Sequence, residues 1–188
     1  MAEGSRIKWN RIFQEKGWGD EPAEFLVECA EFLPAGGRAI DVGGGPGRNA
    51  FWLAQHGFDV TLVDISDEAL DMAKKRAEGD GVALSMWRLD LEVEPFPAGP
   101  WDVVFIHHYL HRPLFSVIER ELAEGGVLLV CQPTQRNFER HDHPSRRYLL
   151  AEGELPGLVP GLRVLRNDEG LYEDRYEVRF VGLKVATS

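Results

Sequence analysis

Residues 39–49, AIDVGGGPGRN, place several glycines directly after a short apolar run that ends at Asp41. The glycines are Gly43, Gly44, Gly45 and Gly47. Glycine lacks a Cβ, so it can turn the chain at positive φ and let a ligand approach the backbone. The helix expected to follow offers unpaired N–H groups at its start. An ordinary strand-to-helix turn needs fewer glycines, so this segment predicts a strand, a loop that receives a nucleotide-like ligand, and a helix.

The spacing within this glycine loop indicates which ligand it receives. A dinucleotide loop has the pattern G-x-G-x-x-G, but the third glycine position counted from Gly43 is Arg48, and a glycine stands instead at Gly47. The pattern D-x-G-x-G-x-G resembles motif I of the class I S-adenosylmethionine-dependent methyltransferases. That resemblance implies S-adenosylmethionine as cofactor, with its methionine end over the loop. It also implies that the carboxylate of Asp41 helps to hold the ammonium group, directly or through water.

Alternating helix and strand signals run along the whole chain. Helices are expected near residues 5–16, 22–33, 49–55, 66–79, 113–122 and 152–158, and strands near 38–42, 58–64, 82–90, 101–107, 127–133, 161–167 and 172–184. Gly79 is expected to end its helix, and the last two strands to turn around Glu169-Gly170. Five strand–helix units predict a parallel, doubly wound α/β sheet. The resemblance adds a Rossmann-like, mostly parallel, seven-stranded sheet of order 3-2-1-4-5-7-6 with a C-terminal antiparallel hairpin.

The length of 188 residues predicts a single domain. Within it we expect an N-terminal helical lid segment (1–35), a cofactor-binding core (36–133), and an acceptor-side loop with the terminal hairpin (134–188). No apolar stretch approaches the roughly 20 residues that cross a bilayer, and the N-terminus lacks an export signal, so we expect a cytoplasmic protein without membrane contact. The net charge of −10 disfavours nucleic acid as a partner.

In an open α/β sheet, ligands bind beyond the carboxyl ends of the strands. Asp64 ends the second strand, 21 residues after Gly43, the separation expected of a carboxylate that accepts from the ribose hydroxyls; its alternative is a plain turn residue. The resemblance places Ile65 against adenine and Asp90 with Leu91 at the adenine edge, although Asp90 also suits a solvated loop. It further assigns the backbone near His107 to the methionine ammonium.

Aromatic residues near the reactive edge can cover a sulfonium and exclude water. Trp9 is the candidate from the N-terminal helix, with Phe13, Trp18 and Tyr109 beside it, and core packing is the competing interpretation of Trp9 and Phe13. The residues we expect to act in catalysis are His108, Tyr109 and His111. Neutral histidine can take a proton from a thiol or hydroxyl, while an exposed loop without a chemical role is the alternative. His107 with His111, and His141 with His143, have spacings seen in metal ligands, but we expect no metal.

The loop at 136–147 gathers four arginines in an acidic chain, namely Arg136, Arg140, Arg146 and Arg147. Such a cluster attracts anions, unless Glu139 and Asp142 neutralise it. Together with Trp9-Asn10 and the PSRRYLLAEGEL stretch (144–155), the glycine loop resembles the tellurite-resistance type of methyltransferase. The resemblance implies an enzyme that methylates a small molecule such as a thiol, a chalcogen oxyanion or another small anionic nucleophile. A non-catalytic S-adenosylmethionine-binding regulator and a nicotinamide-dependent oxidoreductase remain the alternatives.

Overall fold

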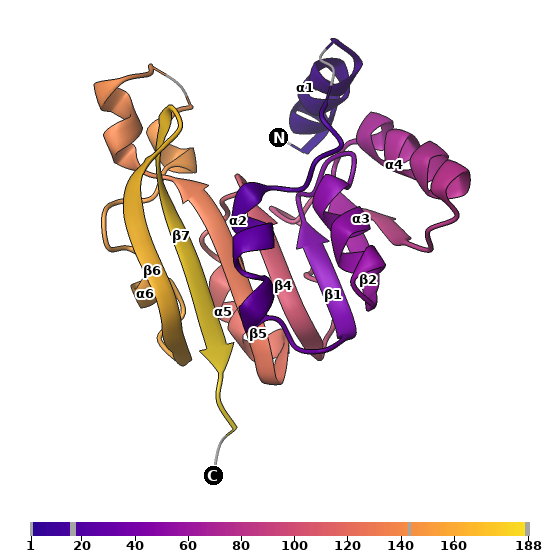
Figure 1. The fold of residues 1–188 in the computed structure, drawn as a ribbon. Helices are drawn as coiled ribbons and strands as arrows, with labels where there is room; N and C mark the ends of the chain where they lie inside the picture. The colour runs from indigo at the N-terminus through magenta and orange to yellow at the C-terminus, as the bar shows by residue number, and fades with distance from the viewer. Residues whose placement is uncertain (1, 16–17, 143, 187–188) are drawn as a thin grey trace.

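The computed structural model describes residues 2–15, 18–142 and 144–186 and contains one seven-stranded sheet, of order β3-β2-β1-β4-β5-β7-β6 (Figure 1). The strands are β1 (Gly37–Val42), β2 (Phe58–Asp64), β3 (Ser85–Arg88), β4 (Trp101–His107), β5 (Leu122–Pro133), β6 (Leu162–Tyr172) and β7 (Arg175–Lys184). Strands β1 to β5 pair in parallel, and β7 pairs antiparallel with both β5 and β6. The predicted fold class and strand order are therefore confirmed.

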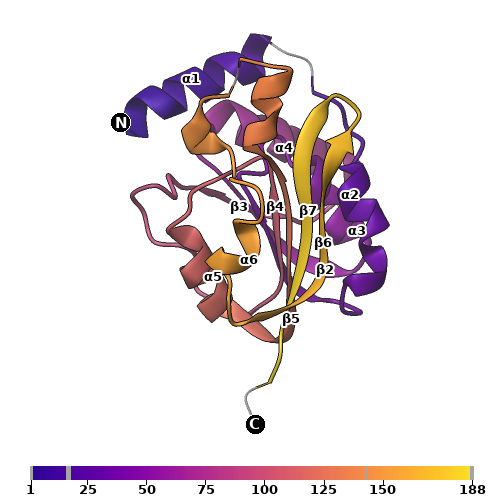
Figure 2. The same ribbon diagram turned by 90° about the vertical axis from the view of Figure 1, so that its left-hand side faces the viewer.

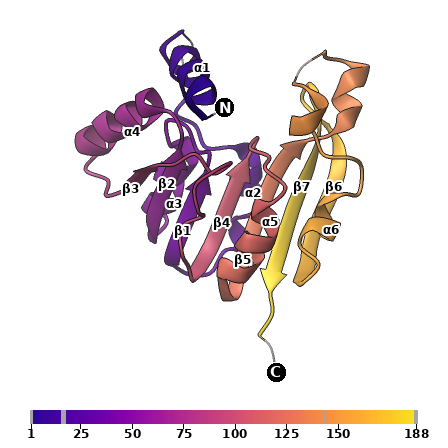
Figure 3. The same ribbon diagram turned by 180° about the vertical axis from the view of Figure 1, so that it is seen from behind.

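Helices cover both faces of the sheet. The helical segments are α1 (Ala2–Glu15), α2 (Glu24–Glu28), η1 (Ala30–Phe32), α3 (Arg48–Gln55), α4 (Asp67–Asp80), α5 (Leu114–Glu121), η2 (Gln135–Glu139), η3 (Arg146–Tyr148) and α6 (Leu155–Leu158). Helices α2 and α3 lie on one face, and α5 and α6 on the other (Figures 1 and 3). Within the described residues, no helix combines the length and the apolarity that crossing a membrane requires.

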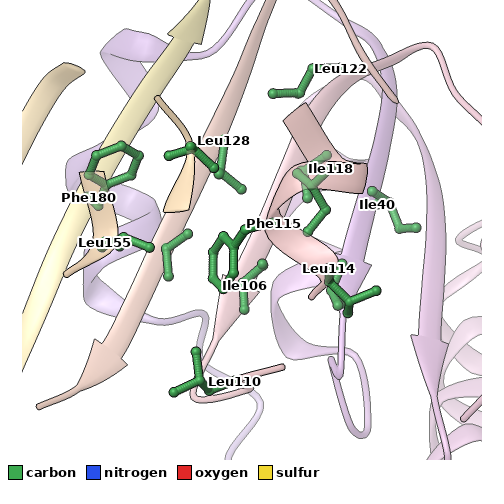
Figure 4. Packing of buried hydrophobic residues seen from close by; sticks show 14 of the residues in the cluster. Ile40, Ile106, Leu110, Leu114, Phe115, Ile118, Leu122, Leu128, Leu155 and Phe180 are labelled. Carbon is green, nitrogen blue, oxygen red and sulfur yellow. The ribbon is translucent and has the colours of Figure 1, made fainter. Parts of the chain in front are cut away.

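Two buried clusters hold the layers together. On one face, Phe25 of α2 and Ala73 of α4 pack with Phe105 of β4. On the other face, Phe115 and Ile118 of α5 pack against the sheet, as Figure 4 shows; its labelled residues are Ile40, Ile106, Leu110, Leu114, Phe115, Ile118, Leu122, Leu128, Leu155 and Phe180. Burial on both faces explains why β4 and β5 are continuous apolar runs rather than alternating ones. The rigid sheet edge that results carries the loops described below.

Several expected boundaries are wrong. Strand β3 is shorter than the expected 82–90, and β5 begins at Leu122 rather than near residue 127. Helix α4 passes through Gly79 and ends at Gly81, whose φ of +66° is the left-handed conformation that closes a helix at glycine. The terminal hairpin does not turn at Glu169-Gly170, because Gly170 pairs with Glu177 inside the ladder. The chain turns instead between Tyr172 and Arg175, four residues later than expected.

The N-terminal segment differs from its prediction in detail. Helix α1 begins earlier than expected, at Ala2, and the predicted end at residue 16 lies outside the described residues. The second expected helix is split into α2 and the single 3₁₀ turn η1 at Cys29. Helix α1 lies beyond the carboxyl ends of the parallel strands, on the same edge as the loop after β5 (Figures 1 and 2). Both segments therefore flank the glycine loop.

Arg112, just after β4, fixes the segment that follows the arginine-rich loop. Its guanidinium forms a two-pronged ion pair with Glu154, in which Nη2 lies 2.9 Å from Oε2. It also donates to the carbonyl oxygens of Arg147 (3.1 Å) and Leu149 (2.9 Å). Glu154 in turn accepts from the backbone N–H of Ala151 at 2.7 Å. One planar side chain thus sets the path of residues 147–154.

We predict that Arg112→Lys lowers the free energy of unfolding by about 1 to 2 kcal/mol, because an ammonium cannot reproduce the fork that binds a carboxylate and two carbonyls. Chemical denaturation and amide exchange of residues 147–154 measure the effect. Arg120→Lys is the matched control, since Arg120 pairs with Glu121 on the surface and such pairs contribute little. Equal stability of the two variants would contradict the assignment.

Candidate functional site

The glycine loop is held against the end of β2 by backbone hydrogen bonds. The N–H groups of Gly43 and Gly44 both donate to the carbonyl oxygen of Val63, at 2.8 and 3.2 Å. Gly43, Gly45 and Gly47 have φ values of +65°, +57° and +84°. L-residues with a Cβ rarely adopt these values, so the sequence needs glycine at each position.

Aromatic rings lie directly over this loop. A Cβ on Gly43 would come within 3.0 Å of the Tyr109 ring, and one on Gly45 within 3.1 Å of Phe13. Phe13 is 6% exposed and contacts Trp18 at a centroid distance of 4.7 Å, while Trp9 is 38% exposed. Phe13 therefore packs in the core and faces the loop at the same time, so the two interpretations given to it are compatible.

Asp64 joins the loop to the start of α4. Its Oδ2 accepts from the N–H of Gly45 at 2.9 Å, and its Oδ1 accepts from the N–H of Ser66 at 2.8 Å. The carboxylate is 8% exposed, and this burial raises its pKa although hydrogen bonds from backbone N–H groups oppose the shift. A carboxylate has about four lone-pair sites, so two directions stay open for further donors.

Asp41 lies beneath the same loop and is 1% exposed. Its Oδ2 accepts from the N–H of Ala50 in the first turn of α3, at 3.1 Å. Its Oδ1 has no partner among the described residues. Burial raises the pKa of Asp41 to about 7, with a smaller contribution from the charge of Asp64. A buried carboxylate oxygen without a donor is costly, so this atom fits a water molecule or a cationic group of a ligand.

The residues assigned to the adenine side lie at the ends of β2 and β3. Ile65 is half-buried and follows Asp64 directly. Asp90 closes a turn in which its Oδ1 accepts from the N–H of Glu92 at 3.0 Å, and Leu91 is 5% exposed. No hydrogen bond within the described residues uses Asp90 Oδ2. The turn interpretation of Asp90 and the ligand interpretation are therefore compatible.

The N-terminal helix is fastened to this site through Asn10, to which the sequence analysis gave no role beyond its part in the resemblance. Asn10 Oδ1 accepts from the hydroxyl of Ser66 at 2.7 Å, and that hydroxyl accepts from the N–H of Ala69 to cap α4. Arg6, one turn earlier on α1, pairs with Asp67 at 2.9 Å. The polar face of α1 thus docks on the start of α4 while Phe13 covers Gly45.

His107, Cys131 and Arg179 occupy one row across three adjacent strands, since His107 pairs with Cys131 and Cys131 with Arg179. Burial, aided by the positive charges nearby, holds the pKa of His107 far below its ordinary value. Its imidazole is therefore neutral near pH 7 and a poor proton acceptor. This environment suits the backbone role assigned to His107 better than acid–base chemistry.

His108 is fixed by several contacts. Its N–H donates to the carbonyl oxygen of Cys131 at 2.9 Å, and its φ is +59°, an uncommon value for a residue other than glycine. The ring lies between Glu177, whose Oε2 is 3.2 Å from Nε2, and Arg175, whose Nη1 is 3.4 Å from Nδ1. The sequence analysis missed Glu177 and Arg175. The pairing of β7 with β5 brings them to His108, and no local sequence motif marks them.

The ligating atoms of His107, His108 and Cys131 lie within 4.8 Å of one another. The two imidazole rings are stacked, however, with centroids 4.0 Å apart and planes 28° apart. Imidazole lone pairs lie in the ring plane, so stacked rings do not point at one ion. His107 and His111, whose spacing is seen in metal ligands on a helix, do not lie on a helix, because α5 begins at Leu114. His143 lies outside the described residues.

Tyr109 and His111 follow His108 on an irregular segment, and both are half-buried. Burial, reinforced by the carboxylates of Glu92, Asp90 and Asp64, raises the pKa of Tyr109. Its phenol therefore stays protonated and can donate a hydrogen bond. The structure brings Tyr109 to the loop at Gly43.

Acidic partners neutralise half of the arginine-rich loop. Arg136 pairs with Glu139 (3.2 Å) and Glu152 (3.5 Å), and Arg140 pairs with Asp174 (2.9 Å). Arg146 stacks on Phe138 and donates to Gln135, and Arg147 stacks on Tyr148. An open hollow of about 420 Å³ is lined by residues Gln135, Arg136, Phe138, Glu139, Ala151 and Glu152. The neutralisation expected from Glu139 occurs, but Asp174 and Glu152 take part in place of Asp142.

Comparison with known proteins identifies the type of domain. Residues 39–126 match the family model described as a methyltransferase domain. The chain is 32% identical over 135 residues to the tRNA 5-carboxymethoxyuridine methyltransferase of Escherichia coli K12, covering 68% of this chain and 52% of that protein. It is 35% identical to an S-adenosyl-L-methionine-dependent Diels-Alderase of Talaromyces variabilis, covering 74% of this chain and 47% of the other. The chain thus spans about half the length of these relatives.

The structure of TehB from Haemophilus influenzae has the same fold. It superposes with a TM-score of 0.72 at 18% identity and covers 85% of this chain and 61% of that one. These comparisons confirm the resemblance to the class I methyltransferases that the glycine loop indicated.

The protonation of Asp41 gives a testable consequence. Its folded-state pKa of about 7 exceeds its ordinary value of 3.8, so between these pH values the folded state binds more protons than the unfolded state. Stability from this group is therefore present below pH 4 and is lost as the pH rises through 7, by about 4 kcal/mol in total.

We predict that Asp41→Asn becomes progressively more stable relative to wild type between pH 4 and pH 8, since an amide still accepts from Ala50 and carries no charge to bury. Urea unfolding of both proteins across this range measures the difference. A difference that does not change with pH would show that Asp41 is ionised in the fold. Asp59→Asn, on the exposed start of β2, is the control.

Proposed function

Because residues 39–126 belong to the methyltransferase domain family, we propose that the protein transfers a methyl group from S-adenosylmethionine to a small nucleophilic acceptor. The observation that carries this proposal is the arrangement of the glycine loop, Asp41 and Asp64 at the carboxyl ends of β1 and β2. The terminal strand β7, inserted antiparallel beside β5, supports it against a nicotinamide enzyme, whose doubly wound sheet has the order 3-2-1-4-5-6.

The site fits the donor. Asp41 Oδ1 is a buried acceptor that has no partner among the described residues, which suits the ammonium of a methionine group or a water bound to it. Asp64 keeps lone pairs for ribose hydroxyls, and Ile65 and Leu91 offer apolar surface to adenine. We propose that the backbone near His107 contacts the ammonium group. Trp9 and Phe13 are proposed to cover the methionine end. When bound, the sulfonium supplies an already activated methyl group.

This chain's residues then have to position the acceptor, exclude water and manage a proton. We assign the removal of the acceptor's proton to His108. Tyr109 is assigned a hydrogen bond to the acceptor, and His111 a supporting polar contact. His107 is left out of proton transfer because burial holds the pKa of its ring far below the ordinary value, so that the ring accepts a proton poorly. These roles rest on the position of the three residues after β4, of which Tyr109 lies against the glycine loop at Gly43.

We propose a small acceptor that carries negative charge. The chain has a formal charge of −10, which repels nucleic acid, yet Arg146, Arg147 and Arg175 lie on the acceptor edge without a carboxylate within ion-pair distance in the described structure. A thiol acid or a chalcogen oxyanion fits this local field. The relative from Escherichia coli acts on tRNA by its name, so tRNA is the second candidate acceptor.

Calorimetry tests the donor. We predict binding of S-adenosylmethionine and its demethylated product, and no binding of NADH. Asp64→Ala should weaken binding by about 30- to 700-fold, since it removes acceptors worth roughly 2 to 4 kcal/mol. Asp71→Ala, on the exposed surface of α4, is the control. Tight binding of NADH, or normal binding by Asp64→Ala, would contradict the donor assignment.

Methyl-release assays test the acceptor class. We predict turnover with 3-mercaptopropionate or tellurite and none with bulk tRNA at physiological salt. Turnover of tRNA alone would replace the small-molecule assignment. Donor binding without turnover of any of these acceptors would favour a non-catalytic regulator.

A further inference from the structure

The contacts of His108 define which of its ring nitrogens carries the proton. Arg175 can only donate, so Nδ1, 3.4 Å from its Nη1, accepts. Nε2 then carries the hydrogen and donates to Glu177 Oε2 at 3.2 Å. Both neighbours therefore specify one tautomer, with the basic lone pair on Nδ1.

Glu177 is built to stay ionised. It is 6% exposed, and burial alone would raise its pKa, but hydrogen bonds from His108, Cys131 and Arg179 hold that pKa below its usual value. Arg179 is itself anchored by Glu24 (3.1 Å) and Glu28 (3.0 Å) of α2. A fixed, negative carboxylate behind an imidazole orients the ring.

The position of His108 is fixed from the backbone as well. Its N–H is bonded to Cys131 of β5, and its φ of +59° persists only because the surroundings hold it. The next residue, Tyr109, lies over Gly43. The imidazole of His108 therefore contacts the hairpin strand β7, while the residue after it contacts the loop that we assign to the donor.

Arg175 faces Nδ1 from the exposed first residue of β7, and its contact is at the long limit of hydrogen bonding. An acceptor with a carboxylate offers that guanidinium a stronger partner. Binding such an acceptor would draw Arg175 from Nδ1 and bring the acceptor's X–H group to the freed lone pair.

We propose that Glu177 is a positioning residue that holds His108 as the general base, and that Arg175 selects acceptors carrying both a carboxylate and an ionisable X–H group. This inference rests on the proposed methyl transfer. The acceptor's proton passes to His108 Nδ1 and its electron pair forms the bond to the methyl carbon. The electron pair of the broken carbon–sulfur bond stays on sulfur, and the proton later leaves His108 for solvent.

Two thiol substrates distinguish a role of His108 as a general base from a purely structural role. The thiol of 3-mercaptopropionate is protonated near pH 7, whereas 2-nitro-5-thiobenzoate is already a thiolate and needs no base; both carry a carboxylate. His108→Asn and Glu177→Gln should each lower kcat for 3-mercaptopropionate by about 100-fold and leave kcat for the thiolate nearly unchanged. Asparagine tolerates positive φ, so His108→Asn removes the base without straining the backbone.

Arg175→Gln should raise KM for 3-mercaptopropionate and leave KM for the uncharged 2-mercaptoethanol unchanged. Glu169→Gln, on the neighbouring strand β6, is the matched control for Glu177→Gln. If His108→Asn and Glu177→Gln lower kcat equally for both thiols, the two residues have a structural role. That result would overturn the assignment of His108 as the base and of Glu177 as its positioning residue. A wild type that binds the donor but methylates neither thiol would overturn the proposed acceptor class, and the base role with it.

The tautomer is tested without turnover. In ¹⁵N spectra of histidine-labelled protein, with His108 assigned by its loss in His108→Asn, the neutral ring should carry its proton on Nε2. A proton on Nδ1 would overturn the roles proposed for His108 and Glu177 even if methyl transfer is found.

Discussion

The carboxylate of Asp64 is the contact on which the rest of the site depends. It accepts from Gly45 in the glycine loop and from Ser66 at the start of α4, so one buried group fixes two segments that the chain brings together only through the pairing of β1 with β2. Ser66 extends the connection to Asn10 of α1. A loop of glycines has little intrinsic preference for one conformation, and this chain of hydrogen bonds supplies the shape that a cofactor needs.

Two buried carboxylates share this small volume, and burial gives them different tasks. Both carboxylate oxygens of Asp64 accept hydrogen bonds from backbone N–H groups. Only one oxygen of Asp41 does so, and the other has no partner among the described residues. Burying such an atom costs stability, and the pKa of about 7 expresses that cost. A cationic ligand group offsets it. The stability that the protein without a ligand loses by burying the Asp41 carboxylate is therefore offset when the ammonium group of the proposed donor binds.

Local sequence patterns predicted the parts of the fold that local physics determines. The expected bounds of β2 and β4 match the structure, because each is an apolar run ended by a polar residue. The hairpin turn was misplaced, because Glu169-Gly170 has turn composition but long-range pairing of β6 with β7 carries the ladder past it. Glu177 was missed for the same reason: only the register of β7 against β5 brings it to His108. Asp41, Asp64 and the glycines could be singled out from the sequence because they lie within one strand–helix–strand unit, and the structure places both carboxylates against the loop.

The central claim is that the glycine loop and the residues after β4 form one site for donor and acceptor. A crystal structure with the demethylated cofactor bound tests it most directly. We predict its amino-acid end over Gly43 to Gly47, its ammonium joined to Asp41 directly or through one water, and its sulfur facing the segment that carries His108 and Tyr109. A ligand bound elsewhere, or a sulfur that faces away from His108, would contradict the account.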